Sequence, residues 1–343
     1  AMERDLEDKI KQKLGGRGEV LLFDLVTPCA GEPETYEKRI GKDLQQARFT
    51  NPTLIVADQD LSSSKRYPGL SESAIKRVAD SLGIPECAYS RGDRAEDFLR
   101  QAEQREARIV LCITGNDRFE EQVVSLADGF EEIAGKLHDT GESVGKRSPG
   151  KLLASIIGKP EYADKISLYA SGDQNRLASY LRLDKEDKAE KQKSLTCLLG
   201  YWLWDSVLRY PGVLVNEIAA SSYLNIKLDA FASATVKDIF SETRYQGPFA
   251  NAIGPMWWRG MLDDIVSDSG FADGRELAEQ RLHTPIPRSA CCEDPTKPAG
   301  YYCMLSSRPV SLENSKSGLT WFPRGADLAR VSLSKYDELG PWL

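Results

Sequence analysis

Short apolar runs alternate with amphipathic stretches over the first 137 residues, and this alternation is typical of a parallel β-sheet covered by helices. The apolar runs that predict strands cover residues 20–23, 53–57, 86–90 and 108–114. Apolar residues recur at helical spacing over residues 36–47, 71–82, 95–106 and 119–137. We therefore predict an α/β domain with a Rossmann-like parallel sheet over residues 1–137.

The pattern changes after this domain. A polar, glycine-rich stretch between residues 138 and 151 is typical of a linker. The pattern that follows is mainly helical, which predicts a helical domain over residues 151–283. Residues 284–343 are rich in proline, glycine and serine, and we expect an irregular segment of short strands and loops there.

Part of the helical domain resembles a helix-turn-helix. Residues 214–220, a turn at Asn225-Ile226 and a helix over 227–242 form the motif, with residues 243–249 as a wing. A DNA reader would place the second helix in the major groove. That helix carries two lysines against three acids, the wrong balance for a surface facing phosphates. The sequence therefore favours a winged-helix-like module that contacts protein.

Composition narrows the classes of partner. The chain has 343 residues, with 45 Lys and Arg against 52 Asp and Glu, a net charge of −7. No overall positive field draws it to nucleic acid or to an anionic membrane, so any such contact needs a local patch. No apolar stretch approaches the ~18 residues of a membrane span, and we expect no membrane association.

Cysteine and histidine are used sparingly. Seven cysteines, an odd number without the spacing of a disulfide scaffold, predict reduced thiols in a cytoplasmic protein. Cys291, Cys292 and Cys303 lack the paired spacing of a structural zinc site, and only His283 is close enough in sequence to be a fourth ligand, so zinc is not expected. The two histidines do not lie near a nucleophile motif.

Acidic residues follow the predicted strands. Ligand sites of parallel α/β sheets lie at the carboxyl ends of the strands, and converging carboxylates repel one another unless a divalent cation is bound. Two such ions can promote phosphodiester hydrolysis, and basic residues of the adjoining loops could hold phosphates. The acids at or just beyond these ends are Asp24, Asp58, Glu96, Asp97 and Asp117.

Two other interpretations compete with a metal site. Each aspartate could simply cap a strand or helix end, where Asp is favoured whatever the function. In the second interpretation, the domain is a Rossmann-like small-molecule sensor. The first predicted strand, however, is not followed by the Gly-x-Gly-x-x-Gly of a dinucleotide site.

Three motifs in order resemble the core of the PIN-like 5′-nucleases, the flap endonuclease and 5′-3′ exonuclease type. They are residues 82–85 (Leu-Gly-Ile-Pro), residues 94–98 (Arg-Ala-Glu-Asp-Phe) and the strand and turn over residues 109–115. The resemblance covers roughly residues 19–130. It implies a PIN-like fold and Mg²⁺ or Mn²⁺ held by Asp24, Asp58, Glu96 and Asp97, with Asp117 as a further catalytic acid.

The active-site motifs depart from the family pattern. Arg94 stands where the family has its first acid, and Asn116 and Arg118 stand where it has the acids of its Thr-Gly-Asp-x-Asp motif. A helix–three-turn–helix is not matched, and residues 145–157 are its poor equivalent. The residues that we expect to bind nucleic acid are Lys65, Arg66, Arg94, Lys146 and Arg147.

Two functions remain open. The lost acids favour an adaptor or regulatory protein with a catalytically impaired, PIN-like domain, which binds a protein partner through the C-terminal helical domain and acts on RNA or single-stranded DNA. The alternative is an active divalent-metal-dependent nuclease that hydrolyses single-stranded or branched nucleic acid.

Overall fold

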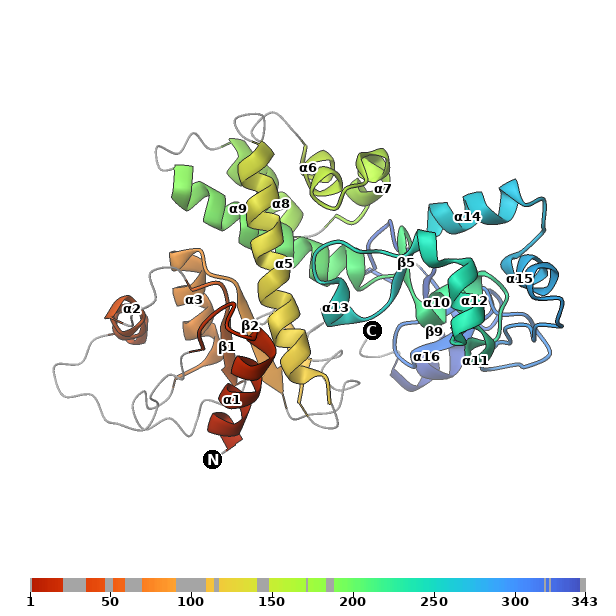
Figure 1. The fold of residues 1–343 in the computed structure, drawn as a ribbon, viewed down its shortest axis with the longest axis horizontal. Coiled ribbons are helices and arrows are strands. Elements are labelled where there is room, and N and C mark those ends of the chain that lie inside the picture. Colours follow the sequence, from red (N-terminus) through yellow and green to blue (C-terminus); the bar gives the residue numbers. More distant parts are fainter. Residues whose placement is uncertain are drawn as a thin grey trace. The chain divides into compact units, whose positions relative to one another are not determined.

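The chain folds into two compact units in a computed structural model (Figure 1). Unit 1 contains residues 1–146 and 176–201, and unit 2 contains residues 147–175 and 202–343. The structure describes residues 2–20, 35–46, 52–58, 70–90, 109–113, 117–140, 148–170, 172–182, 188–317, 319–320 and 322–339. No helix among these ranges is long and apolar enough to cross a membrane.

A three-stranded parallel sheet forms the centre of unit 1. Its strands are β1 (Ile55–Asp58), β2 (Glu86–Ser90) and β3 (Val110–Cys112), in the order β1-β2-β3. Ala88 of β2 pairs with Ala57 on one side and with Val110 on the other. The predicted parallel sheet is thus confirmed for three strands, whereas residues 21–23 of the predicted strand 20–23 lie outside the described residues.

The crossover from β1 to β2 runs through α3 (Glu72–Leu82), close to the helix that the sequence predicts. Buried side chains of α3 pack with Ile40 of α2 (Tyr36–Gln46) and with Leu70. The helix ends at Gly83, which has the left-handed φ of 64°. A Cβ atom there would lie 2.8 Å from Cβ of Lys193, so glycine also permits the close approach.

Helices α1 (Met2–Leu14), α5 (Phe119–Thr140) and α9 (Lys188–Trp202) also belong to unit 1, except for Trp202. So do residues 176–182 of α8 (Gly172–Arg182). Phe119 of α5 contacts Tyr89 of β2 edge-on, at 6.0 Å between ring centroids. The Tyr201 hydroxyl accepts the Glu86 N–H at 2.7 Å. α9 thus contributes directly to the packing of the sheet, although it is distant in sequence.

Two glycines, Gly212 and Gly325, let the backbone approach the Tyr169 side chain closely in unit 2. Its hydroxyl accepts the Val213 N–H at 2.9 Å and donates to the Tyr210 carbonyl at 3.2 Å. A Cβ on Gly212 or Gly325 would overlap with Tyr169 atoms at 2.2–2.3 Å. Unit 2 also contains the helices α6 (Pro149–Ile156), η2 (Pro160–Tyr162) and α7 (Ala163–Ser167), residues 172–175 of α8, and the π-helix η3 (Leu203–Leu208).

A small antiparallel sheet and five short helices form the middle of unit 2. Strand β4 (Leu214–Asn216) pairs with β5 (Met256–Trp258), and Arg244 forms an isolated bridge to Trp257. Between these strands lie α10 (Glu217–Tyr223), α11 (Leu228–Phe231), α12 (Ala234–Ile239), η4 (Ser241–Thr243) and α13 (Ala250–Ile253). The turn after α10 is at Asn225, with φ 58°, where the sequence predicts it.

The single helix predicted over residues 227–242 is wrong. Ser233 adopts an extended conformation, with φ −65° and ψ 144°, and its side chain accepts a hydrogen bond from the Val236 N–H. Serine competes for backbone groups in this way and favours caps over helix interiors. The segment therefore forms two short helices, α11 and α12.

Residues beyond 283 form short strands and loops, as predicted, and the strands join in one sheet. They are β6 (Tyr301–Cys303), β7 (Arg308–Val310), β8 (Ser315–Lys316) and β9 (Ala329–Ser332), in the order β7-β6-β9-β8. Helices α14 (Arg259–Asp268) and α15 (Gly274–Leu282) precede this sheet, and α16 (Leu333–Leu339) follows it. The tail is thus more ordered than an irregular segment.

Candidate functional site

The structure describes only two of the predicted catalytic acids, Asp58 and Asp117. The other predicted site residues lie outside the described ranges, and they are Asp24, Lys65, Arg66, Arg94, Glu96, Asp97, Lys146 and Arg147. The predicted metal site and the predicted nucleic-acid patch therefore stay predictions.

Asp58 lies at the carboxyl end of a parallel strand, as the sequence predicts. It is the last residue of β1 and pairs with Tyr89 of β2. Asp117 lies in an exposed turn between β3 and α5. β1 and β3 flank β2, so their axes are about 10 Å apart, twice the spacing of neighbouring strands. The sheet alone therefore does not bring the two carboxylates to one ion.

Arg118 extends the exposed turn at Asp117. Its Nε donates to Glu121 Oε2 at 3.2 Å, one helical turn along α5. Both side chains are about half exposed, so this pair stabilises the helix by only a few tenths of a kcal/mol. Among the residues described, no three His, Cys, Asp or Glu side chains are arranged to hold a metal ion.

The cysteines of unit 2 gather on the C-terminal sheet. Cys291 and Cys303 are buried with Val310, and Cys292 packs against this cluster. All three are free thiols. Cys303 Sγ accepts the N–H groups of Ser306 at 3.4 Å and Ser332 at 3.3 Å. Hydrogen-bond donors thus surround the sulfur atoms.

The pKa values of the neighbouring thiols Cys291 and Cys292 are shifted in opposite directions. Burial acts to raise the pKa of the Cys291 thiol, but hydrogen bonds from the backbone N–H groups of Asp294 and Glu293 and from Ser311 outweigh it, and the pKa is lowered. Burial raises the pKa of Cys292 to about 11. Cys292 is therefore a poor nucleophile at neutral pH.

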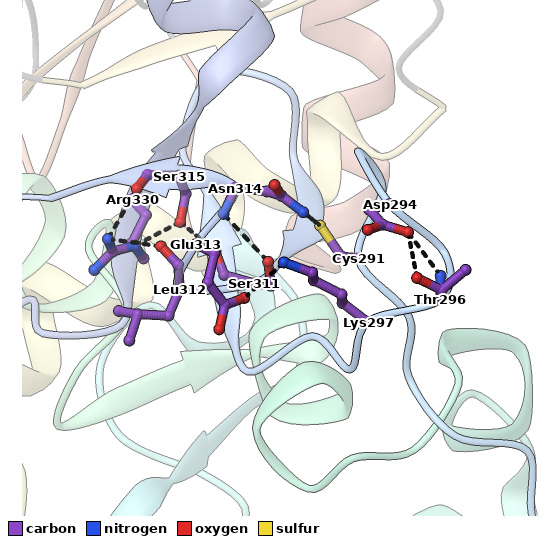
Figure 2. A network of polar contacts seen from close by, with 10 residues as sticks. All are labelled: Cys291, Asp294, Thr296, Lys297, Ser311, Leu312, Glu313, Asn314, Ser315 and Arg330. Carbon is purple, nitrogen blue, oxygen red and sulfur yellow. Dashed lines mark hydrogen bonds and ion pairs between the residues drawn. The ribbon is translucent and has the colours of Figure 1, made fainter.

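A polar network on the loop between β7 and β8 links Cys291 to Arg330 (Figure 2). Asn314 Nδ2 donates to Cys291 Sγ at 3.7 Å, and the Asn314 N–H donates to Ser311 Oγ at 3.3 Å. The Ser315 hydroxyl donates to the Ser311 carbonyl and accepts from Arg330 Nε at 2.6 Å. The network fixes the loop over residues 311–316.

Sequence reasoning missed Arg330. The only signal is a charged residue inside the apolar run over residues 328–331. Such a residue alternates with apolar neighbours in many half-exposed strands, so the pattern alone does not indicate that the side chain is buried.

The exposed face of α11 and α12 is not basic. Lys237 forms an ion pair with Glu217, and Lys227 pairs with Asp229 at 3.3 Å. The exposed residues of these helices are small or acidic, namely Asp229, Ala232, Ala234, Thr235 and Asp238. This face lacks the free cations that a phosphate backbone would need.

Comparisons with protein-family models, with curated proteins and with solved structures find no significant match to this chain.

Proposed function

We propose that this chain is a nucleic-acid-associated adaptor or regulatory protein, built on a catalytically impaired PIN-like domain and a winged-helix-like module that contacts a protein partner. The observation that carries the proposal is the ion pairing of Lys227 and Lys237 within the module. With both lysines neutralised, the face that would read DNA offers small and acidic side chains.

The order of elements in unit 2 supports a winged-helix-like module. A strand (β4), two helical segments (α10, then α11 and α12), a bridge at Arg244 and a returning strand (β5) follow one another. β5 lies between β4 and Arg244 in this small sheet. Within this proposal the wing is the predicted segment 243–249, which includes the Arg244 bridge to β5.

The sheet of unit 1 supports a PIN-like domain. Its three parallel strands follow one another in sequence order, and Asp58 ends the first of them. The impairment is inferred from the sequence, where Arg94, Asn116 and Arg118 replace acids of the family motifs. Each replacement removes a carboxylate on which Mg²⁺ would rely.

Within this proposal, nucleic acid binds to Lys65, Arg66, Arg94 and Lys146 of unit 1 and to Arg147, the first residue of unit 2, while the winged-helix-like module of unit 2 recruits protein. The test uses the full chain with a 5′-labelled single-stranded RNA and the matching DNA, in the presence of Mg²⁺ or Mn²⁺. We expect saturable binding by fluorescence anisotropy and intact substrate on a denaturing gel. The proposal is contradicted if the chain binds neither the RNA nor the DNA.

The alternative is an active divalent-metal-dependent nuclease, which is favoured by Asp58 at a strand end. Titration calorimetry of Mn²⁺ into the full chain and into its Asp24→Asn variant separates the two functions. Cleavage and Mn²⁺ binding that both disappear in the variant would establish the nuclease. Binding of RNA without cleavage or Mn²⁺ uptake would support the adaptor.

A further inference from the structure

Arg330 is a buried arginine without a carboxylate partner among the described residues. It lies on β9, and only 8% of its surface is exposed. Its Nε donates to Ser315 Oγ, and its Nη2 donates to the carbonyls of Ser315 at 3.0 Å and Leu312 at 3.3 Å. In the part of the chain that the structure describes, every polar partner of this guanidinium is neutral.

Burial of an uncompensated charge is unfavourable. The pKa of Arg330 is lowered by burial, and Tyr301 acts against this shift. The Tyr301 ring lies 4.9 Å from the guanidinium carbon, and a cation–π contact of this kind recovers only part of the cost. An anion at the guanidinium would remove the imbalance.

One edge of the guanidinium is available to such an anion. Nη1 makes no hydrogen bond within the described structure, while Nε and Nη2 are both used. Figure 2 shows Arg330 at one end of the network, with a terminal nitrogen pointing away from the other labelled residues. Leu312, whose carbonyl accepts from Nη2, has a side chain that is 54% exposed.

We propose that Arg330 binds an oxyanion, a carboxylate or a phosphate, through its free Nη1 edge. The remaining hydrogen bonds of Arg330 hold its side chain in place before the anion arrives, so little side-chain entropy is lost on binding. The guanidinium geometry suits both oxyanions, and charge-assisted hydrogen bonds give the interaction its strength.

The competing interpretation is that Arg330 only fixes the loop over residues 311–316. Three hydrogen bonds to that loop would be sufficient for this role. Loop fixation predicts that loss of Arg330 lowers stability, but it predicts no specific response to an added anion. Anion binding is therefore the property to measure.

The test follows the arginine Nε–Hε resonances of the full chain by ¹H–¹⁵N NMR. Inorganic phosphate and acetate are titrated separately, with sodium chloride keeping the ionic strength constant. We expect one arginine resonance to shift saturably, and the Arg330→Lys and Arg330→Gln variants to assign it by its loss. The tighter of the two anions identifies the chemistry of the ligand.

Arg308 provides the matched control, because it lies on the same sheet, opposite Cys303, and is exposed. Arg308→Gln should keep the saturable shift, whereas either Arg330 variant that folds should weaken anion binding at least tenfold. If both Arg330 variants fail to fold, nuclear Overhauser contacts between the shifting resonance and the Tyr301 ring, which lies 4.9 Å from the guanidinium carbon, assign it in the wild type instead. The proposal is overturned if no arginine resonance saturates, or if the shift survives in an Arg330 variant.

Discussion

Single hydroxyl groups hold distant parts of each unit together. In unit 1, Tyr201 of α9 supplies the acceptor for the Glu86 N–H at the start of β2. In unit 2, Tyr169 bridges the Val213 N–H and the Tyr210 carbonyl. A buried backbone group without such a partner costs free energy, so these hydroxyls determine which helix can cover which strand.

The variant Tyr201→Phe removes the acceptor and keeps the ring that contacts Phe130. Because the Glu86 N–H would be left unsatisfied in a buried place, we expect the free energy of unfolding to fall by about 1–3 kcal/mol. Urea denaturation followed by circular dichroism measures the change. Tyr336→Phe, in a partly exposed position of α16, is the control, and an equal loss in both variants would contradict the prediction.

The raised pKa of the Tyr223 hydroxyl predicts that stability changes at high pH. Burial, together with the hydrogen bond from its hydroxyl to Asp263 Oδ1 at 2.6 Å, raises its pKa to about 12. The unfolded chain would ionise this group near pH 10. Between these values the folded state keeps a proton that the unfolded state has lost, so stability is full below about pH 10 and falls as the pH rises to 12.

The variant Tyr223→Phe isolates this effect from other tyrosines. We expect the variant to lose less stability than the wild type between pH 10 and pH 12. Absorbance titration near 295 nm should also lose a group that ionises near pH 12 in the folded protein. Loss of a group that titrates near pH 10 would show that Tyr223 is not perturbed.

For single residues, the sequence predicts where an acid such as Asp58 lies better than it predicts which buried groups contact each other. The position of Asp58 follows from the end of an apolar run, because parallel strands that are buried on both faces read as continuous apolar segments. The roles of Tyr201 and Arg330 depend on partners 115 and 15 residues away. Local patterns do not record such partners.

Helices approach each other closely where glycine replaces a side chain. Gly200 of α9 lies against Phe130 of α5, and a Cβ atom on it would be 2.2 Å from the ring. The rings of Phe130 and Tyr201 are in turn 5.8 Å apart, nearly edge to face. The packing of α9 on α5 therefore requires a residue without a Cβ atom at position 200.

Two glycine-to-alanine variants should change stability in opposite directions. Gly200→Ala forces Phe130 away, and overpacking of this kind costs about 1–3 kcal/mol. Gly135→Ala lies on the exposed side of α5 with nothing within 4 Å, so the better helix former should add about 0.5–1 kcal/mol. Guanidinium denaturation measures both, and the same sign for both would contradict this account.

Helix boundaries were predictable where periodicity and caps agree. α3 and α5 begin and end within a few residues of the predicted ranges, because amphipathic spacing and Gly83 indicate the same limits. The break between α11 and α12 was missed. Apolar spacing continues across Ser233. The break comes from its side chain, which donates to the Ala230 carbonyl of α11 and accepts from the Val236 N–H of α12.

The distribution of charge over the whole chain limits how nucleic acid can bind. Only local basic residues are available in a chain of net charge −7. The five predicted contacts would give a slope of at most about −3.5 for log K against log salt concentration, at roughly 0.7 per phosphate on a single strand.

Anisotropy titrations at several salt concentrations test this limit. The variant Lys65→Ala/Arg66→Ala should make the slope shallower by about 1.4, since two counterions fewer are released. A matched exchange of exposed cations in unit 2, Lys316→Ala/Arg324→Ala, should leave it unchanged. The assignment of the patch would be wrong if the second variant had the larger effect.

At the scale of the whole molecule, a mixture of helices with a parallel sheet is predictable from the sequence, but the course of the chain is not. Continuous apolar runs separated by amphipathic helices indicate a parallel sheet, and three strands of one are present. The predicted domain ranges 1–137, 151–283 and 284–343 stay predictions. Composition marks polar linkers, whereas the contacts of Tyr201 and Gly200, far along the chain, attach residues 176–201 to unit 1.

This attachment has a consequence for how unit 1 can be transferred between proteins. A fragment ending in the polar stretch near residue 146 would keep β1, β2 and β3, but it would uncover the Glu86 N–H and the Phe130 ring. Neither truncation nor gene fusion can therefore isolate this unit as one continuous stretch. Any recombination that preserves it must carry both of its parts, residues 1–146 and 176–201, with a connection between them.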